Sequence, residues 1–243
     1  MENAITAGLS RQIVLARALE VTANNIANQN TSGFKAERVG FREYLARLDG
    51  AEAGDPYVSL VFDPDSYTDF SAGGVEATYA PLDFAIEGDG FFAVETDQGT
   101  FYTRDGRFSL DASGAVVTRS GARVLDQAGA PIVLDPELGD VALANDGALQ
   151  QDGTVVATLG VFAFDDRRVL TKRGDNLFAA AAEPAAEPAP RIRQGYVETS
   201  NVVSIAAITD MVEIMRAYEQ AASLIETSNQ LARDAIRTLS EPA

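Results

Sequence analysis

The chain has 243 residues, 46% of them hydrophobic, which is enough to bury one large domain or a small domain with extensions. It contains neither cysteine nor histidine. That composition excludes a disulfide framework and a thiolate zinc site, and it removes the commonest general base. We therefore expect no cofactor, no metal and no enzymatic activity.

The formal net charge of −17 is concentrated in the middle of the chain. Residues 51–190 contain 24 acidic and eight basic residues, whereas residues 1–30 contain two of each. Near-neutral ends can associate with little repulsion, while an acidic body stays soluble. No basic patch is present to replace the counterions of a nucleic acid, so we expect no such partner.

Residues 3–28 predict a first helix with an apolar seam that steps by four and three residues. Its members are Ile5, Leu9, Gln12, Ala16, Leu19, Ala23 and Ile26. Such spacing suits packing against another helix. The run from Asn28 to Gly33 ends the helix, because Asn and Gly tolerate left-handed backbone geometry. Phe34 follows as an apolar anchor.

Four asparagines, Asn24, Asn25, Asn28 and Asn30, stand within seven residues at the end of this helix. Asparagine is a poor helix former, so together they weaken the helix. Fraying explains the last two but not Asn24 and Asn25, which lie further inside. We interpret the cluster as side-chain amides that bond to the backbone or to neighbouring subunits.

The middle of the chain predicts an extended arm, a β-domain and a linker. Residues 36–80 form the arm, because Gly and Pro interrupt any regular run while aromatic residues argue against disorder. Residues 81–180 form an antiparallel β-domain, with turn glycines every seven to nine residues from Gly90 to Gly129. Residues 181–199, rich in Ala and Pro at first, form a linker and return segment.

A second long helix is predicted over residues 202–239, with Ser200 or Asn201 as its N-cap. Its seam has the same spacing as the first: Ser204, Ile208, Met211, Met215, Tyr218, Ala222, Ile225, Asn229, Ala232, Ile236 and Leu239. The fold class is therefore α+β. The N- and C-terminal helices form a coiled-coil-like pair from residues 1–35 and 200–243, around a central antiparallel all-β domain.

Other patterns in the sequence could indicate a ligand site, an active site or a membrane segment. Gly88-Asp89-Gly90 has no third glycine and precedes a strand, so a phosphate-binding loop is not favoured. The Asp-Gly pairs lack the closing glutamate of a calcium loop. No pair of acids stands out as a glycosidase site, although a carboxylate-dependent peptidoglycan hydrolase and a free-standing binding module stay open as alternatives. The apolar run that ends at Arg17 is too short for the hydrophobic region of a signal peptide. No stretch is long enough to span a membrane, so we expect no direct membrane insertion.

Three stretches in chain order resemble the flagellar axial proteins, which include the rod, hook and hook-associated proteins. They are NNIANQNTSGFK at 24–35, DFAIEGDGFF at 83–92 with YTRDGRF at 102–108, and GYVETSNV at 195–202. The opening residues 1–10 and the single β-body are most similar to the proximal-rod members. Distal-rod or hook proteins are the alternative.

The resemblance implies a structural subunit of the flagellar basal body, in the rod that crosses the periplasm. It implies export through the flagellar type III apparatus and polymerisation with itself and with other rod subunits into a drive shaft that transmits torque. The expected polymer-interface residues come from the two seams and their breaks. They are Ile5, Leu9, Ala16, Leu19, Ala23, Asn24, Asn25, Ile26, Asn28, Gly33, Phe34, Asn201, Ile208, Met211, Met215, Tyr218, Ala222, Ile225, Asn229, Ile236 and Leu239.

Deleting residues 1–30 or 205–243 should leave a folded β-domain that no longer joins basal bodies, because the deleted helices carry the seams. Circular dichroism of the purified deletion proteins and immunoblots of isolated basal bodies test the two halves of this expectation. Recovery of a deletion protein in basal bodies at the wild-type level would contradict it.

Overall fold

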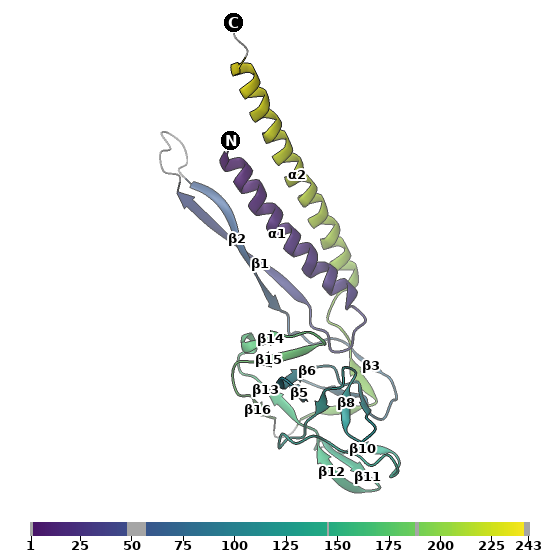
Figure 1. Ribbon diagram of the computed structural model, residues 1–243. Coiled ribbons are helices and arrows are strands. Elements are labelled where there is room, and N and C mark those ends of the chain that lie inside the picture. Colours follow the sequence, from purple (N-terminus) through teal and green to yellow (C-terminus); the bar gives the residue numbers. More distant parts are fainter. Residues whose placement is uncertain (1, 48–56, 145, 188–189, 241–243) are drawn as a thin grey trace. The chain divides into compact units, whose positions relative to one another are not determined.

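A computed structural model describes residues 2–47, 57–144, 146–187 and 190–240 (Figure 1). The chain forms two compact units. The helical unit comprises Met1–Ala27, Glu37–Asp69 and Val203–Ala243, and the β unit comprises Asn28–Ala36 and Phe70–Val202. The chain therefore passes between the two units four times.

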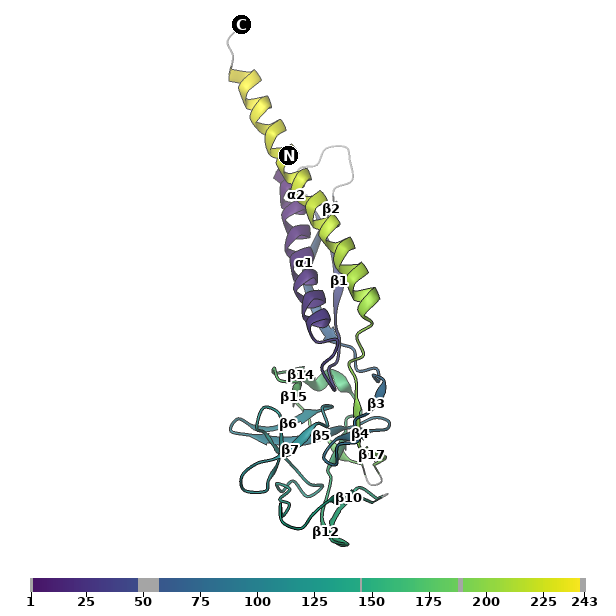
Figure 2. The same cartoon turned by 90° about the vertical axis from the view of Figure 1, so that its right-hand side faces the viewer.

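The helical unit contains α1 (Glu2–Ala27), α2 (Ser204–Ser240) and a hairpin of β1 (Glu37–Arg47) and β2 (Tyr57–Thr68). The two helices run side by side in opposite directions, with α1 also contacting the hairpin (Figures 1 and 2). At 37 residues against 26, α2 extends beyond the N-terminal end of α1. Among the described residues, no helix is both long and apolar enough to cross a bilayer.

The predicted extended arm is largely an antiparallel hairpin. From Glu37 opposite Thr68 to Arg47 opposite Tyr57, the two strands pair with one irregularity between Gly40 and Arg42. The sequence did not reveal this pairing because the alternation of apolar residues is interrupted and the partners lie far apart. The remaining arm residues, 48–56, lie outside the described part of the chain.

The β unit consists of short strands and one 3₁₀ turn, η1 (Arg167–Val169). The strands are β3 (Val75–Ala77), β4 (Phe84–Ile86), β5 (Phe91–Thr96), β6 (Gly99–Thr103), β7 (Phe108–Leu110), β8 (Val116–Thr118), β9 (Arg123–Val124), β10 (Val141–Leu143), β11 (Ala148–Gln151), β12 (Thr154–Thr158), β13 (Val161–Ala163), β14 (Leu170–Lys172), β15 (Leu177–Ala180), β16 (Ala185–Ala186), β17 (Ile192–Gln194) and β18 (Tyr196–Glu198).

Every strand pair in the described residues is antiparallel, as the turn spacing predicted. The main sheet has the order β14-β15-β6-β5-β9-β8-β7, with β13 also pairing with β5 and β16. Smaller sheets are formed by β10-β11-β12, by β17-β4 and by β18-β3. The central β-domain of the α+β prediction is therefore confirmed.

Strand β5 lies at the centre of the core and is buried on both faces. Phe92 and Val94 join one apolar cluster, and Phe91 and Ala93 join a second cluster rich in aromatic rings. This division follows from the period of two in a strand, which sends neighbouring side chains to opposite faces. The double-Phe start of β5 thus connects the two halves of the core.

Residues 181–199, predicted to be a linker and return segment, contribute three short strands. Strand β16 pairs with β13, β17 with β4, and β18 with β3. Strands of two or three residues are too short to show a period in the sequence, and backbone pairing with strands distant in the chain orders them instead. Residues 188–189 of this stretch lie outside the described ranges.

The predicted N-cap of α2 is wrong by two or three residues. The helix begins at Ser204, and the carbonyl of Val203 accepts the first intrahelical bond from the Ala207 amide at 2.9 Å. Ser200 caps only locally, since its Oγ accepts from the Val202 amide at 3.2 Å. Asn201 bonds elsewhere, as described below.

Replacing Phe92 by alanine should lower the free energy of unfolding by about 3–5 kcal/mol, because its fully buried ring would leave a cavity at the centre of the sheet. Urea unfolding followed by circular dichroism measures the loss. Val133→Ala, at a half-exposed position, is the matched control and should change stability by about 0.5 kcal/mol or less. Equal losses in both variants would show that β5 is not the centre of the core.

Candidate functional site

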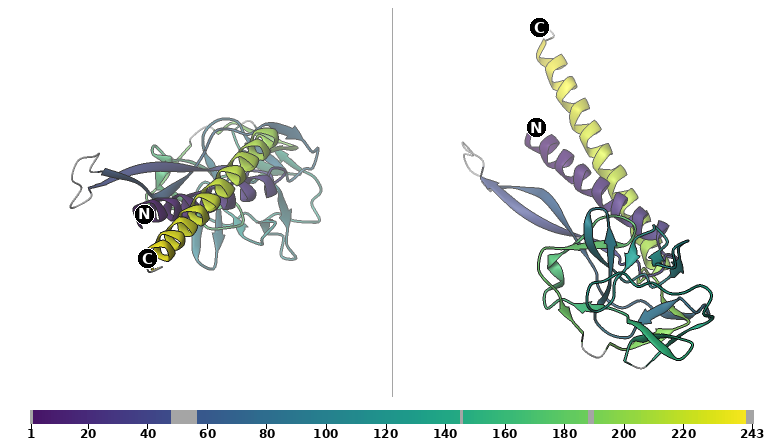
Figure 3. Two further views of the ribbon diagram at one scale, coloured as in Figure 1. Left: turned by 90° about the horizontal axis from the view of Figure 1, so that it is seen from above. Right: turned by 60° about the horizontal axis from the view of Figure 1, so that its bottom comes forward.

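The helices α1 and α2 are in close contact within the helical unit. Val14, Ala18 and Val21 of α1 and Ala221 of α2 are buried there. A Cβ added at Gly8 would come within 2.8 Å of Ile225 Cγ1, so the absence of a side chain at Gly8 permits a close approach to α2. Figure 3 shows the two helices crossing each other. Small side chains let helix backbones approach closely, which suits a dry and tight contact.

This buried stripe differs from the seam predicted for α2. Met211, Ala222, Ile225 and Asn229 of the predicted seam are half-buried in the helical unit. Ile208, Met215 and Tyr218 are exposed instead. Among the described side chains of α2, only that of Ala221 is buried. Ile236 and Leu239 lie outside the residues whose side chains are described.

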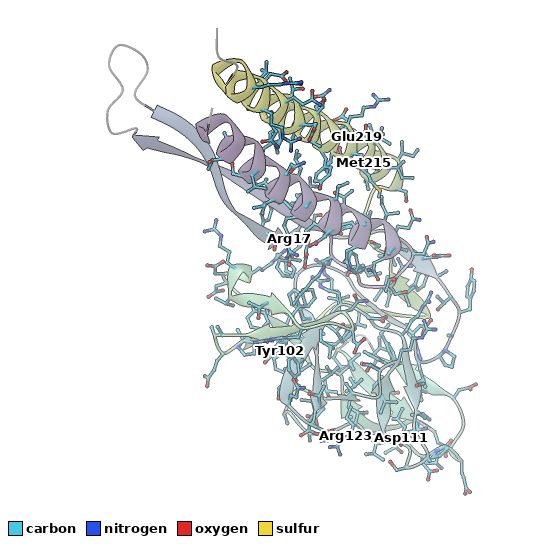
Figure 4. All side chains as sticks on the ribbon, turned by 45° about the horizontal axis from the view of Figure 1, so that its top comes forward. Arg17, Tyr102, Asp111, Arg123, Met215 and Glu219 are labelled. Atoms are coloured by element: carbon cyan, nitrogen blue, oxygen red, sulfur yellow. The ribbon has the colours of Figure 1, made fainter. Side chains whose placement is uncertain are left out.

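A stripe of exposed apolar side chains runs along the first turns of α2. It consists of Ile205, Ile208, Val212 and Met215, which are 81%, 51%, 42% and 46% exposed. Steps of three, four and three residues keep them on one side of the helix. Glu219, one turn beyond Met215, ends the stripe (Figure 4). We call these four residues the exposed stripe.

The predicted interface residues of α1 are divided between the surface and the half-buried side. Leu9, Ala23 and Asn24 are exposed, whereas Ala16, Leu19 and Ile26 are half-buried. Ile13, which the predicted seam omitted, is also exposed. The side chain of Ile5 lies outside those described.

The asparagine cluster is engaged with nearby groups of the same chain. The Asn25 side chain donates from Nδ2 to the Glu37 carbonyl at 2.8 Å and accepts from the Glu37 amide at 2.9 Å. It thus ties the end of α1 to the start of β1 by both groups of its amide. Asn28 Oδ1 accepts from Thr31 Oγ1 at 3.2 Å. These bonds explain why residues that weaken a helix stand at its end.

Gly33 and Phe34 are buried in the β unit. Gly33 has a φ of +66°, and an added Cβ would lie 2.3 Å from the Asp105 amide nitrogen. Its own amide donates to the Glu198 carbonyl at 2.8 Å. The Phe34 ring lies under the Lys172 ammonium, 4.1 Å from the ring centroid. The segment that follows α1 is therefore packed against the β unit at several points.

A buried ionic cluster surrounds the carboxylate of Glu198. Lys35 Nζ donates to Glu198 Oε1 at 2.6 Å, and Arg104 Nη1 donates to Oε2 at 3.2 Å. All three side chains are at most 4% exposed. Burial lowers the pKa of Lys35 from its ordinary value by desolvating the ammonium, while the Glu198 carboxylate acts in the opposite direction. Desolvation likewise lowers the pKa of Arg104.

Asn201 lies close to this cluster. Its Oδ1 accepts from the Ala36 amide at 2.7 Å, and its Nδ2 donates to the Ser71 carbonyl and to Ser71 Oγ, both at 3.1 Å. Sequence reasoning included Asn201 among the functional residues but missed Lys35, Arg104 and Glu198. Glu198 stands inside the GYVETSNV motif, which is the one signal that could have pointed to it.

In the parts of the chain that the structure describes, no three acidic side chains gather as metal ligands would. The structure provides a close pair of helices and the exposed stripe on α2 in the helical unit, and the buried ionic cluster around Glu198 in the β unit. These features are typical of a structural subunit.

Three family models match the chain in order. The model for "Flagella basal body rod protein" matches residues 5–35, and that for "Flagellar hook protein FlgE/F/G D1 domain" matches residues 85–157. The model for "Flagellar basal body rod FlgEFG protein C-terminal" matches residues 193–238. Together they define the class as a structural protein of the flagellar axis.

Similar proteins cover nearly the whole chain. The flagellar basal-body rod protein FlgF of Caulobacter vibrioides is 40% identical over 241 residues, 98% of each chain. FlgF of Mesorhizobium japonicum is 36% identical over 244 residues, again 98% of each chain. FlgG of Bacillus subtilis is 29% identical over 263 residues, 97% of this chain and 98% of the other.

The chain belongs to the flagellar basal-body rod protein family, with greater similarity to these FlgF proteins than to the FlgG protein. It is a structural component of the flagellar basal body and not an enzyme. The resemblance found in the sequence is thereby confirmed.

Gly33→Ala should destabilise the β unit more than Gly121→Ala does. Both glycines have positive φ, but an added Cβ at Gly121 meets nothing within 4 Å, while at Gly33 it meets backbone. The control should lose about 1 kcal/mol for left-handed geometry, and Gly33→Ala should lose at least about 1–3 kcal/mol more for the displaced backbone. Urea unfolding of both variants measures the difference. Equal losses would show that the close approach at Gly33 adds nothing.

Proposed function

We propose that this protein polymerises through its terminal helices into the proximal part of the flagellar rod. In that position it transmits torque across the periplasm. Its partners are copies of itself and the neighbouring proximal- and distal-rod proteins, after export by the flagellar type III apparatus. The observation that carries the proposal is the exposed stripe on α2, in a chain that belongs to the rod family.

The composition of the exposed stripe supports this role. Four large apolar side chains along one side of a helix are a costly surface to leave in water. The side of α2 that is buried or half-buried within the chain, which includes Ala207, Ile214 and Ala221, is a different one. A neighbouring helix can therefore cover the stripe without separating α1 from α2. In this arrangement, α1 and α2 form a pair that associates with further pairs.

The charge distribution supports the same assignment. The helices are near neutral while most of the negative charge lies between residues 51 and 190. Helices can then approach other subunits without strong repulsion, and an acidic β unit stays hydrated. In the proposed rod, the exposed stripe of one subunit contacts a different surface of the next subunit. Such contacts propagate along a helical assembly rather than closing into a dimer.

Ile208→Asp and Met215→Asp should each block incorporation into the rod, because a charge would have to be buried against the neighbouring subunit. The monomer's free energy of unfolding should change by about 0.5 kcal/mol or less, since both side chains are exposed. Immunoblots of purified basal bodies measure incorporation, and urea unfolding measures stability.

Two further substitutions on α2 serve as controls. Gln220→Asp introduces the same charge at an exposed polar position and should incorporate normally. Ala221→Asp places the charge on the side buried against α1 and should instead destabilise the monomer. Wild-type incorporation of Ile208→Asp would refute the proposed use of the exposed stripe.

A further inference from the structure

Because the chain passes between its units four times, several connecting segments must be held together, whereas a single linker needs no such alignment. After Ala27, Ala36, Asp69 and Val202 the chain changes unit. Three segments of the β unit lie next to these passages, namely residues 28–36, residues 70–74 and residues 198–202. They are far apart in sequence, so local structure cannot keep them together.

The Glu198 side chain is bonded to two of these segments while itself belonging to the third. From segment 28–36, Lys35 Nζ donates to Oε1 at 2.6 Å. From segment 70–74, the Gly73 amide donates to the same oxygen at 2.9 Å. Arg104 holds the other oxygen and donates from Nη2 to the Gly88 carbonyl at 2.8 Å, which ties the carboxylate to the connection between β4 and β5.

Asn201 bonds to the same two segments three residues later. It accepts from the Ala36 amide in the first segment and donates to the Ser71 carbonyl in the second. The Lys35 ammonium closes the set by donating to the same Ser71 carbonyl at 2.7 Å. Two side chains from one stretch of chain therefore connect all three segments.

The direction of hydrogen bonds, rather than their stability, explains why polar groups connect these segments. Apolar side chains of similar volume would be about as stable as a buried ion pair, and removing one member of the pair would leave an uncompensated charge. Directed hydrogen bonds, however, specify one alignment of the segments, whereas apolar contacts permit sliding. The 5.1 Å stacking of Arg104 over the Phe91 ring extends the alignment into the aromatic core.

We propose that Glu198 and Asn201, with Lys35 and Arg104, form a junction clamp that aligns the three segments through which the chain passes between its units. The inference rests on the proposed function, because a subunit that transmits torque must keep every connection between its units from yielding. Glu198 and Asn201 are positioning residues within this clamp.

Hydrogen exchange of the full-length purified protein tests the clamp residue by residue. In Asn201→Ala the Ala36 amide, and in Glu198→Met the Gly73 amide, should exchange about tenfold faster, because each loses its acceptor. In Asn201→Ala, which leaves no buried charge unpaired, the core amides of Val116 and Leu125 should keep their wild-type rates. Glu76→Gln, an exposed acid on β3, is the control and should change none of these rates.

A triple variant separates alignment from stability. Lys35→Met, Arg104→Met and Glu198→Met together remove every charge of the cluster, so the melting temperature should recover relative to Glu198→Met alone. The Gly73 amide should nevertheless stay fast, since no acceptor has been restored. Protection of Gly73 in the triple variant would overturn the clamp, as would an equal increase of exchange throughout the β unit in Asn201→Ala. These readouts do not depend on rod assembly, so failure of the exposed stripe is distinguishable from failure of the clamp.

Discussion

The buried carboxylate of Glu198 is the group around which three distant segments of the β unit are hydrogen-bonded. A carboxylate withdrawn from water must be surrounded by donors, and here the donors come from Lys35, Gly73 and Arg104. The same residue's carbonyl accepts from the Gly33 amide, and Gly33 can lie against the backbone of Arg104 and Asp105 only because it lacks a side chain. Desolvation thus makes one residue the meeting point of segments up to 163 positions apart.

The ionic cluster contacts the apolar core at strand β5. Phe91 and Phe92 are neighbours in sequence, but they fill different apolar clusters because a strand alternates its faces. Arg104 stacks on the Phe91 ring, and Phe178 and Phe164 meet that ring edge-on. A low-dielectric aromatic layer beside the ionic cluster strengthens its hydrogen bonds. The charged and apolar parts of the β unit therefore support each other.

The helical unit buries some apolar residues within the chain and leaves others exposed on the same helices. Gly8 permits a close approach of α1 to Ile225 of α2, and Ala18 and Ala221 are buried in the same unit. Larger apolar side chains such as Ile208 and Met215 are left on the outside of the same helix. One helix can in this way hold its partner in the chain and still offer an apolar surface to another molecule.

The sequence by itself determined the two terminal helices, the antiparallel β-domain between them and the rod-family motifs, because periodicity and turn glycines are local signals. Tertiary structure decided which side of α2 is buried, since that choice depends on what packs against the helix. It also decided the β1–β2 hairpin and the strands β16, β17 and β18, whose pairings are long-range. The ionic cluster of Lys35, Arg104 and Glu198 was not predicted from the sequence. The three charged residues are far apart in the chain, and only folding brings their side chains together and removes them from water.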